Sequence, residues 1–118
     1  MDLLRFELPY PPSVNHYYIR TSTGVIISHK GTQYRRDVGY LLNRYRNSYP
    51  PEARLTVTIN VYAPDKRKRD IDNILKCLLD AMEHAQVYHN DNQIDMLTVI
   101  RRDPVKDGCV QIWISECS

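Results

Sequence analysis

The segment RLTVTINVY, residues 54–62, alternates apolar and polar side chains along its whole length. One side of the alternation carries Leu55, Val57, Ile59 and Val61, and the other carries Thr56, Thr58 and Asn60. A period of two predicts a β-strand with one face buried in a core. The elements on either side of this strand decide the kind of core.

Two further β elements are predicted before this strand. Residues 3–10 predict a short strand that Pro11 and Pro12 stop. Residues 16–28 predict a β-hairpin with Gly24 in its turn, because both arms are rich in aromatic and β-branched residues.

A helix is predicted on each side of the central strand. The first has Ser28 as its N-cap and runs to about Asn47, and the second begins near Asp70. Residues 94–102 and 109–115 then predict two more strands. The second helix is expected to bury Ile71, Ile74, Leu75, Leu78 and Met82 and to expose Asp72, Lys76, Asp80 and Glu83. This order predicts an α/β fold, a mixed β-sheet with two main helices packed against it.

The length and composition fit one small domain, residues 1–118. Apolar residues make up 42% and charged residues 25%, as is usual for a globular protein with a core. No apolar run can span a bilayer and the N-terminus lacks a secretion pattern, so we expect a cytoplasmic protein with no membrane partner. Cys77, Cys109 and Cys117 lack CxxC spacing, which favours reduced thiols and argues against structural zinc.

The segment KRKRDIDNILK, residues 66–76, sets a basic run directly before two aspartates. The run consists of Lys66, Arg67, Lys68 and Arg69. Because the net charge of the chain is only +2, affinity for a polyanion must come from local clusters of this kind. Phosphate contacts supply most of the sequence-independent affinity for nucleic acid, so the run predicts DNA or RNA binding.

The neighbouring carboxylates fit a metal site. Asp70 and Asp72 converge on one object only if Asp70 is the N-cap of the helix and Asp72 lies in its first turn. Asp91, in a polar loop before the next strand, supplies a third carboxylate. Three such groups suit Mg²⁺, which prefers oxygen ligands, and metal-bound carboxylates beside phosphate suit phosphodiester hydrolysis.

Each of these residues also has a structural interpretation. Asp70 can serve as a helix cap alone, and Asp91 as a turn residue. Asp72 and Lys76, four residues apart, can form an ordinary surface pair, or Lys76 can instead reach a phosphate oxygen and stabilise its charge. The basic run beside the carboxylates favours the nuclease interpretation.

These motifs resemble the RusA family of Holliday junction resolvases, and the resemblance covers nearly the whole chain. It begins with LPYPPSVNHYY, residues 8–18, and continues through SHKGTQYRRDV, residues 28–38. It is most specific at PDKRKRDIDNILKCLLDAM, residues 64–82, and closes with NDNQI, residues 90–94. A RusA-like fold is what this resemblance implies.

The resemblance also implies an activity. Family members are homodimeric endodeoxyribonucleases, common in phages and prophages, that cut four-way DNA junctions with paired symmetric nicks and need Mg²⁺ or Mn²⁺. Their metal-binding catalytic aspartates correspond to Asp70, Asp72 and Asp91, and their catalytic lysine to Lys76. The best-known pattern has a second acidic residue where this chain has Asn90, so Asp91 is left as the ligand in that loop.

The expected partner is branched DNA rather than a small molecule. The residues expected to contact it are Lys66, Arg67, Lys68, Arg69, Asn73 and Asn15. Asn73 falls on an asparagine of the family pattern, and Asn15 lies in the proline-rich N-terminal motif. Alternative functions are a nuclease for flaps or replication forks and a junction-binding protein without catalysis. The apolar hairpin and the second helix are both candidate dimer surfaces.

Overall fold

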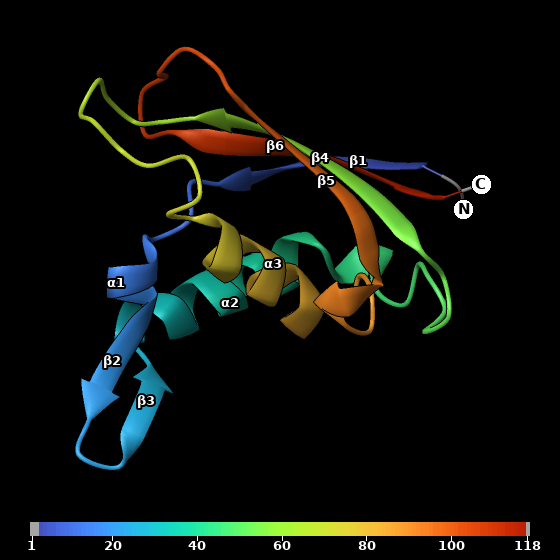
Figure 1. Ribbon diagram of the computed structural model, residues 1–118, viewed down its shortest axis with the longest axis horizontal. Helices are drawn as coiled ribbons and strands as arrows, with labels where there is room; N and C mark the ends of the chain where they lie inside the picture. The colour runs from blue at the N-terminus through green and yellow to red at the C-terminus, as the bar shows by residue number, and fades with distance from the viewer. Residues whose placement is uncertain (1–2, 118) are drawn as a thin grey trace.

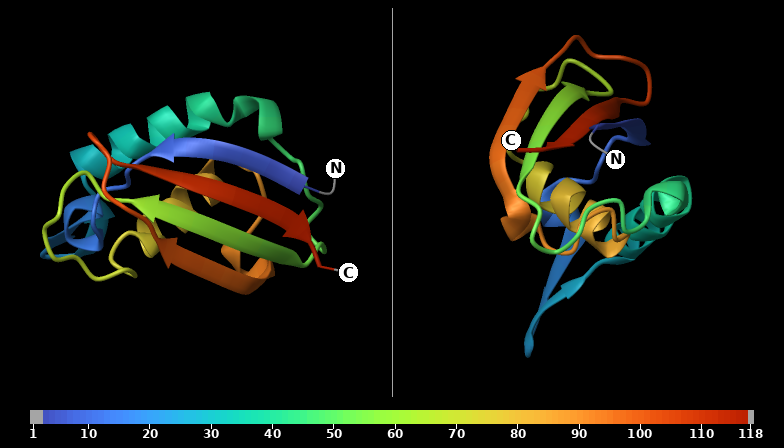
Figure 2. Two further views of the ribbon diagram at one scale, coloured as in Figure 1. Left: turned by 90° about the horizontal axis from the view of Figure 1, so that it is seen from above. Right: turned by 90° about the vertical axis from the view of Figure 1, so that its right-hand side faces the viewer.

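The computed structural model describes residues 3–117, and its centre is a four-stranded sheet in the order β1-β6-β4-β5. The strands are β1 (Leu3–Pro9), β4 (Leu55–Tyr62), β5 (Ile94–Arg101) and β6 (Cys109–Glu116). β4 pairs parallel with β5 and antiparallel with β6, and β1 pairs antiparallel with β6. The sheet is therefore mixed, with β1 and β5 at its two edges (Figure 2).

The two main helices cover one face of this sheet (Figure 1). They are α2 (His29–Leu41) and α3 (Leu75–His84), and the short elements are α1 (Val14–Tyr17), η1 (Asn43–Tyr45) and η2 (Asp91–Gln93). The hairpin of β2 (Tyr18–Thr21) and β3 (Gly24–Ile27) projects away from the body. The predicted α/β fold with a mixed sheet and two packed helices is confirmed. From residue 3 to residue 117, no helix is long and apolar enough to cross a membrane.

The core lies between the sheet and the helices. Leu55, Val57 and Ile59 of β4 are fully buried, as the alternating pattern predicts. Asn60, predicted on the polar side, is also buried, and its side-chain oxygen accepts a hydrogen bond from Arg102 Nε at 3.1 Å. A buried amide needs such a partner, because an unsatisfied one costs free energy.

The first helix begins as predicted but ends earlier. Ser28 Oγ accepts the Gly31 backbone N–H at 2.9 Å, which is an N-cap contact. A side chain at Gly31 would meet the Tyr17 carbonyl oxygen at 2.6 Å, so this helix position requires glycine. The helix stops at Leu41, and η1 follows with tighter turns. Asn47, the predicted end, has φ 58° and donates its backbone N–H to Gln86 instead.

The prediction that the second helix begins near Asp70 is wrong, because α3 begins at Leu75. Two consecutive turns precede it, with Asn73 N bonded to Asp70 O at 3.1 Å and Leu75 N bonded to Asp72 O at 3.2 Å. The Asn73 carbonyl accepts the Val14 N–H of α1 at 2.9 Å. A tertiary hydrogen bond therefore uses a carbonyl that a longer helix would need.

This later start changes the local geometry. Asp70 is not the N-cap, and Asp72 is not in the first helical turn. Asp72 and Lys76 consequently do not share a helix face, although both side chains are exposed. Ile71, predicted on the buried face, is 39% exposed, whereas Ile74 is buried.

Candidate functional site

The basic run, residues 66–69, lies in the loop between β4 and α3, where Asp65 orders it. Asp65 Oδ1 accepts the Arg67 backbone N–H at 2.9 Å and lies 2.8 Å from Arg69 Nη1. The hydrogen bond from Arg69, followed by that from the Arg67 backbone, lowers the pKa of Asp65 to about 2. Asp65 is thus ionised at neutral pH, and its contacts with Arg67 and Arg69 order the loop.

The four cations of the run are not equivalent. The side chain of Arg67 is 82% exposed and that of Arg69 only 23%. Arg69 lies over the Tyr10 ring at 6.0 Å, and Arg101 Nη2, from the end of β5, donates to the Arg69 carbonyl at 2.6 Å. Arg69 is therefore anchored, while Lys66, Arg67 and Lys68 face solvent and are available to an anion.

One surface hollow brings five of the predicted site residues together. It is lined by Asn15, Lys68, Arg69, Asp70, Asn73 and Arg101. The hydrogen bond between Val14 and Asn73 places α1 beside the turns before α3, which explains how Asn15 lines the same hollow as Asp70. The hollow combines one carboxylate with three cations, so it can accommodate both a metal ion and a phosphate.

Lys76 does not line this hollow and lies beside Tyr18 instead. The Lys76 ammonium lies 5.8 Å from the centre of the Tyr18 ring. Burial raises the pKa of Tyr18, and the negative charges of Asp80 and Asp91 add to this rise.

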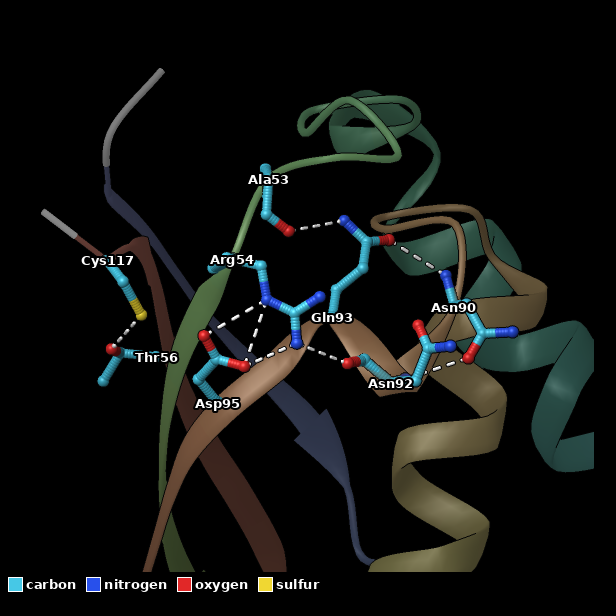
Figure 3. Close-up of polar contacts among 8 residues, drawn as sticks. All are labelled: Ala53, Arg54, Thr56, Asn90, Asn92, Gln93, Asp95 and Cys117. Atoms are coloured by element: carbon cyan, nitrogen blue, oxygen red, sulfur yellow. Dashed lines mark hydrogen bonds and ion pairs between the residues drawn. The ribbon is translucent and has the colours of Figure 1, made fainter.

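A buried amide fixes the loop that carries Asp91. Gln93 Nε2 donates to the carbonyls of Pro50 and Ala53 at 3.0 and 2.9 Å. Its Oε1 accepts the Asn90 N–H at 3.0 Å, as Figure 3 shows. With 1% exposure, Gln93 satisfies all these groups away from water, so the backbone at Asp91 is held in place.

Asn90 has a structural role in the same loop. Its Oδ1 accepts the Asn92 N–H at 2.9 Å and caps η2. Arg54 then joins this loop to β5, because its guanidinium bonds both the Asn92 carbonyl, at 2.8 Å, and the Asp95 carboxylate (Figure 3). The asparagine at position 90 thus shapes the turn before Asp91.

The three predicted metal ligands are free of ion pairs. In the described part of the chain, ion pairs engage Asp65, Asp80 and Asp95 but not Asp70, Asp72 or Asp91. All three free carboxylates are exposed. Within residues 3–117, however, no three Asp, Glu, His or Cys side chains lie close enough to hold one ion. The chain supplies oxygen ligands that suit Mg²⁺, but it does not gather all three.

A network around Asp80 was not predicted from the sequence. Asp80 Oδ2 accepts Tyr17 Oη at 2.5 Å and Arg35 Nη2 at 2.7 Å, which ties α1, α2 and α3 together. Burial and the hydrogen bond to Asp80 raise the pKa of Tyr17. Helical spacing places Asp80 on a polar face but cannot reveal a partner that is 45 or 63 residues away.

Asp65 was also missed, but the sequence does contain a signal for it. An aspartate in a loop commonly accepts the backbone N–H two residues later, and Asp65 does so with Arg67.

Comparisons with known proteins agree with the motifs. Residues 9–115 match the family Endodeoxyribonuclease RusA. The crossover junction endodeoxyribonuclease rusA of Enterobacteria phage HK97 is 40% identical over 98% of this chain and 97% of the relative. The RusA proteins of Escherichia coli K12 and Enterobacteria phage 82 are 28% and 29% identical over the same shares. The resemblance seen in the motifs is confirmed, and the chain belongs to the Endodeoxyribonuclease RusA family.

Proposed function

We propose that this chain is a metal-dependent endodeoxyribonuclease that resolves Holliday junctions by paired symmetric phosphodiester hydrolysis. Family membership and the printed names of its relatives, crossover junction endodeoxyribonucleases, support the substrate class. The observation that carries the proposal is the position of Asp70. Its carboxylate is unpaired, yet it lines a hollow with Lys68, Arg69 and Asn73.

The proposed cofactor is Mg²⁺, with Mn²⁺ as a substitute, and its ligands are Asp70, Asp72 and Asp91. Mg²⁺ is commonly held by one or two carboxylates, with waters and substrate phosphates in the remaining positions. The three carboxylates need not meet in the free chain, because one or two protein carboxylates are enough to hold Mg²⁺. When bound, the ion lowers the pKa of a water and stabilises charge on the leaving oxygen.

The remaining residues bind and orient the DNA. Lys66, Arg67 and Lys68 contact backbone phosphates, since their side chains face solvent. Asn15 and Asn73 offer amide groups at the rim of the hollow, where they orient the strand. Lys76 holds its ammonium beside Tyr18 and stabilises negative charge on the phosphate that is being cut.

We also propose that the protein acts as a homodimer in the cytoplasm. A four-way junction has approximate twofold symmetry, so a C2 dimer presents two equivalent sites to two equivalent strands. Paired nicks follow from that symmetry.

A nicking assay on a synthetic four-way junction tests the proposal. Wild-type protein should nick the junction in Mg²⁺ and leave linear duplex and flap DNA intact. The cleavage rate of the Asp70→Asn variant should fall at least about a hundredfold, because a proposed metal ligand is lost. The variant should still bind the junction, because its fold is unchanged.

Asp37→Asn is the matched control, because this exposed aspartate of α2 accepts a hydrogen bond from Gln33 and lies on the surface away from the hollow. It should cleave at the wild-type rate. Normal cleavage by Asp70→Asn would contradict the site assignment. Equal cleavage of flaps and junctions would favour a broader branched-DNA nuclease, and binding without cleavage in any divalent metal would favour an inactive junction binder.

A further inference from the structure

The strand β5 has an unusual surface for its composition. Its apolar residues are Ile94, Met96, Leu97, Val99 and Ile100, yet none of its eight residues is buried. Met96 and Leu97 point to opposite faces of the sheet and are 60% and 39% exposed. Ile94 and Val99 pack partly against the core, whereas Met96 and Leu97 leave apolar surface exposed on both faces of this edge.

The backbone of β5 is also open on one side. Among the described strands β5 pairs with β4 alone, so the N–H and C=O groups of its outer edge have no strand partner. The other edge of the sheet differs, because β1 exposes Arg5 and Glu7 and ends at Pro9. Charges and proline protect an edge strand from pairing, whereas a long apolar edge invites it.

We propose that β5 is the surface on which two copies of this chain associate, with their β5 strands pairing antiparallel into a continuous eight-stranded sheet. This inference rests on the proposed function, which includes a homodimer, and it names the surface through which the two copies pair. An antiparallel pair of identical strands has a twofold axis by construction, as an isologous dimer requires.

The sequence of β5 selects one register. With Thr98 facing its own copy, the cross-strand pairs become Leu97 with Val99, Met96 with Ile100 and Asp95 with Arg101. The Leu97–Val99 and Met96–Ile100 pairs each lie on one face of the sheet, so apolar side chains meet apolar ones. Asp95, at the irregularity in the pairing of β5 with β4, comes opposite Arg101 at the end of the strand. A shift by one residue would instead place Asp95 opposite Ile100.

The charges at the two ends can join such a pair without breaking existing contacts. Asp95 is paired with Arg54, but its side chain is still 47% exposed. Arg101 donates to the Arg69 carbonyl with one nitrogen and has further N–H groups. A carboxylate accepts several hydrogen bonds, so Asp95 can bind both arginines.

Self-association measured without DNA tests the interface. Wild-type protein should sediment as a dimer, and Met96→Lys should raise its dissociation constant roughly a hundredfold, tenfold for each of the two copies. Val25→Lys is the matched control, because Val25 of the projecting hairpin is also 60% exposed and apolar. It should leave the dimer intact. Equal thermal unfolding of the two variants would show that both fold.

Cross-linking tests the register. In a Cys117→Ser background, Thr98→Cys should form an intermolecular disulfide under mild oxidation, because facing residues have Cα atoms roughly 4.5–5.5 Å apart. Val25→Cys in the same background should cross-link far more slowly. A monomeric wild type, a dimer unaffected by Met96→Lys, or no preference for Thr98→Cys would overturn the proposal. The junction-nicking assay on wild-type protein reports on the proposed function independently.

Discussion

At the scale of single residues, two aspartates of one loop have different uses. Asp65 is bound to Arg67 and Arg69, whereas no ion pair of the described chain engages Asp70. A carboxylate that is already neutralised by its own chain attracts a metal ion weakly, because its charge is shared. The free Asp70, with Lys68 beside it, is the better ligand.

The depressed pKa of Asp65 predicts a pH dependence of stability. Its folded pKa of about 2 lies below the ordinary aspartate pKa of 3.8, so the ionised Asp65 stabilises the fold above pH 3.8. That contribution is lost as the pH falls through about 2. Urea unfolding of wild type and Asp65→Asn should therefore differ at pH 7 and converge near pH 2.

An NMR titration checks the same residue directly. The Asp65 carboxyl carbon should titrate below the carboxyl carbons of aspartates in a denatured reference peptide. If Asp65 titrated at the reference pKa, its ion pairs with Arg67 and Arg69 would not order the loop in solution.

Gln93 gives a stability prediction at the same scale. Gln93→Leu keeps the volume but leaves the Pro50 and Ala53 carbonyls without their amide donor. We expect a loss of about 2–3 kcal/mol in the free energy of unfolding, because buried unpaired polar groups are costly. Urea denaturation measures it.

The exposed Gln33 on α2 provides the matched control. Gln33→Leu should change stability by less than about 0.5 kcal/mol. Equal effects of the two substitutions would show that the Gln93 hydrogen bonds do not stabilise the loop at Asp91.

At the scale of elements, local sequence patterns predicted the elements that burial and capping determine. They did not predict a helix start that a tertiary hydrogen bond determines. The strand at 55–62 and the Ser28 cap followed from local patterns. The start of α3 did not, because Asp70 and Ile71 fit a helix pattern while the Asn73 carbonyl bonds Val14 of α1. No local signal reports that bond.

The loop between β4 and α3 yields a prediction about DNA affinity. Lys66→Gln with Lys68→Gln should reduce the salt dependence of junction binding by about two in the log–log slope, since each phosphate contact contributes about 0.9. Fluorescence anisotropy at several salt concentrations measures the slope.

The control for this pair is Arg20→Gln with Lys30→Gln, which removes two exposed cations from β2 and α2. Its slope should match that of the wild type. If both double variants lost the same amount, the attraction would come from overall charge rather than from the basic run.

At the scale of the whole molecule, the sequence predicted the fold and five of the six residues that line the hollow. The hollow brings Asn15 together with Asp70 and Asn73, although Asn15 is far from the other two in the sequence. Within residues 3–117 of the single chain, Asp70, Asp72 and Asp91 do not form one metal-binding cluster. The network of Tyr17, Arg35 and Asp80 depends on packing between helices, which one sequence cannot show.

We propose that a dimer of this chain cuts two strands of a four-way junction in a coordinated way. The most direct measurement uses a supercoiled plasmid that extrudes a cruciform, incubated with wild-type protein in Mg²⁺ or in EDTA. The account predicts linear plasmid in Mg²⁺, from two symmetric nicks within one binding event, and no product in EDTA. Accumulation of nicked circles alone, or cutting that persists in EDTA, would contradict it.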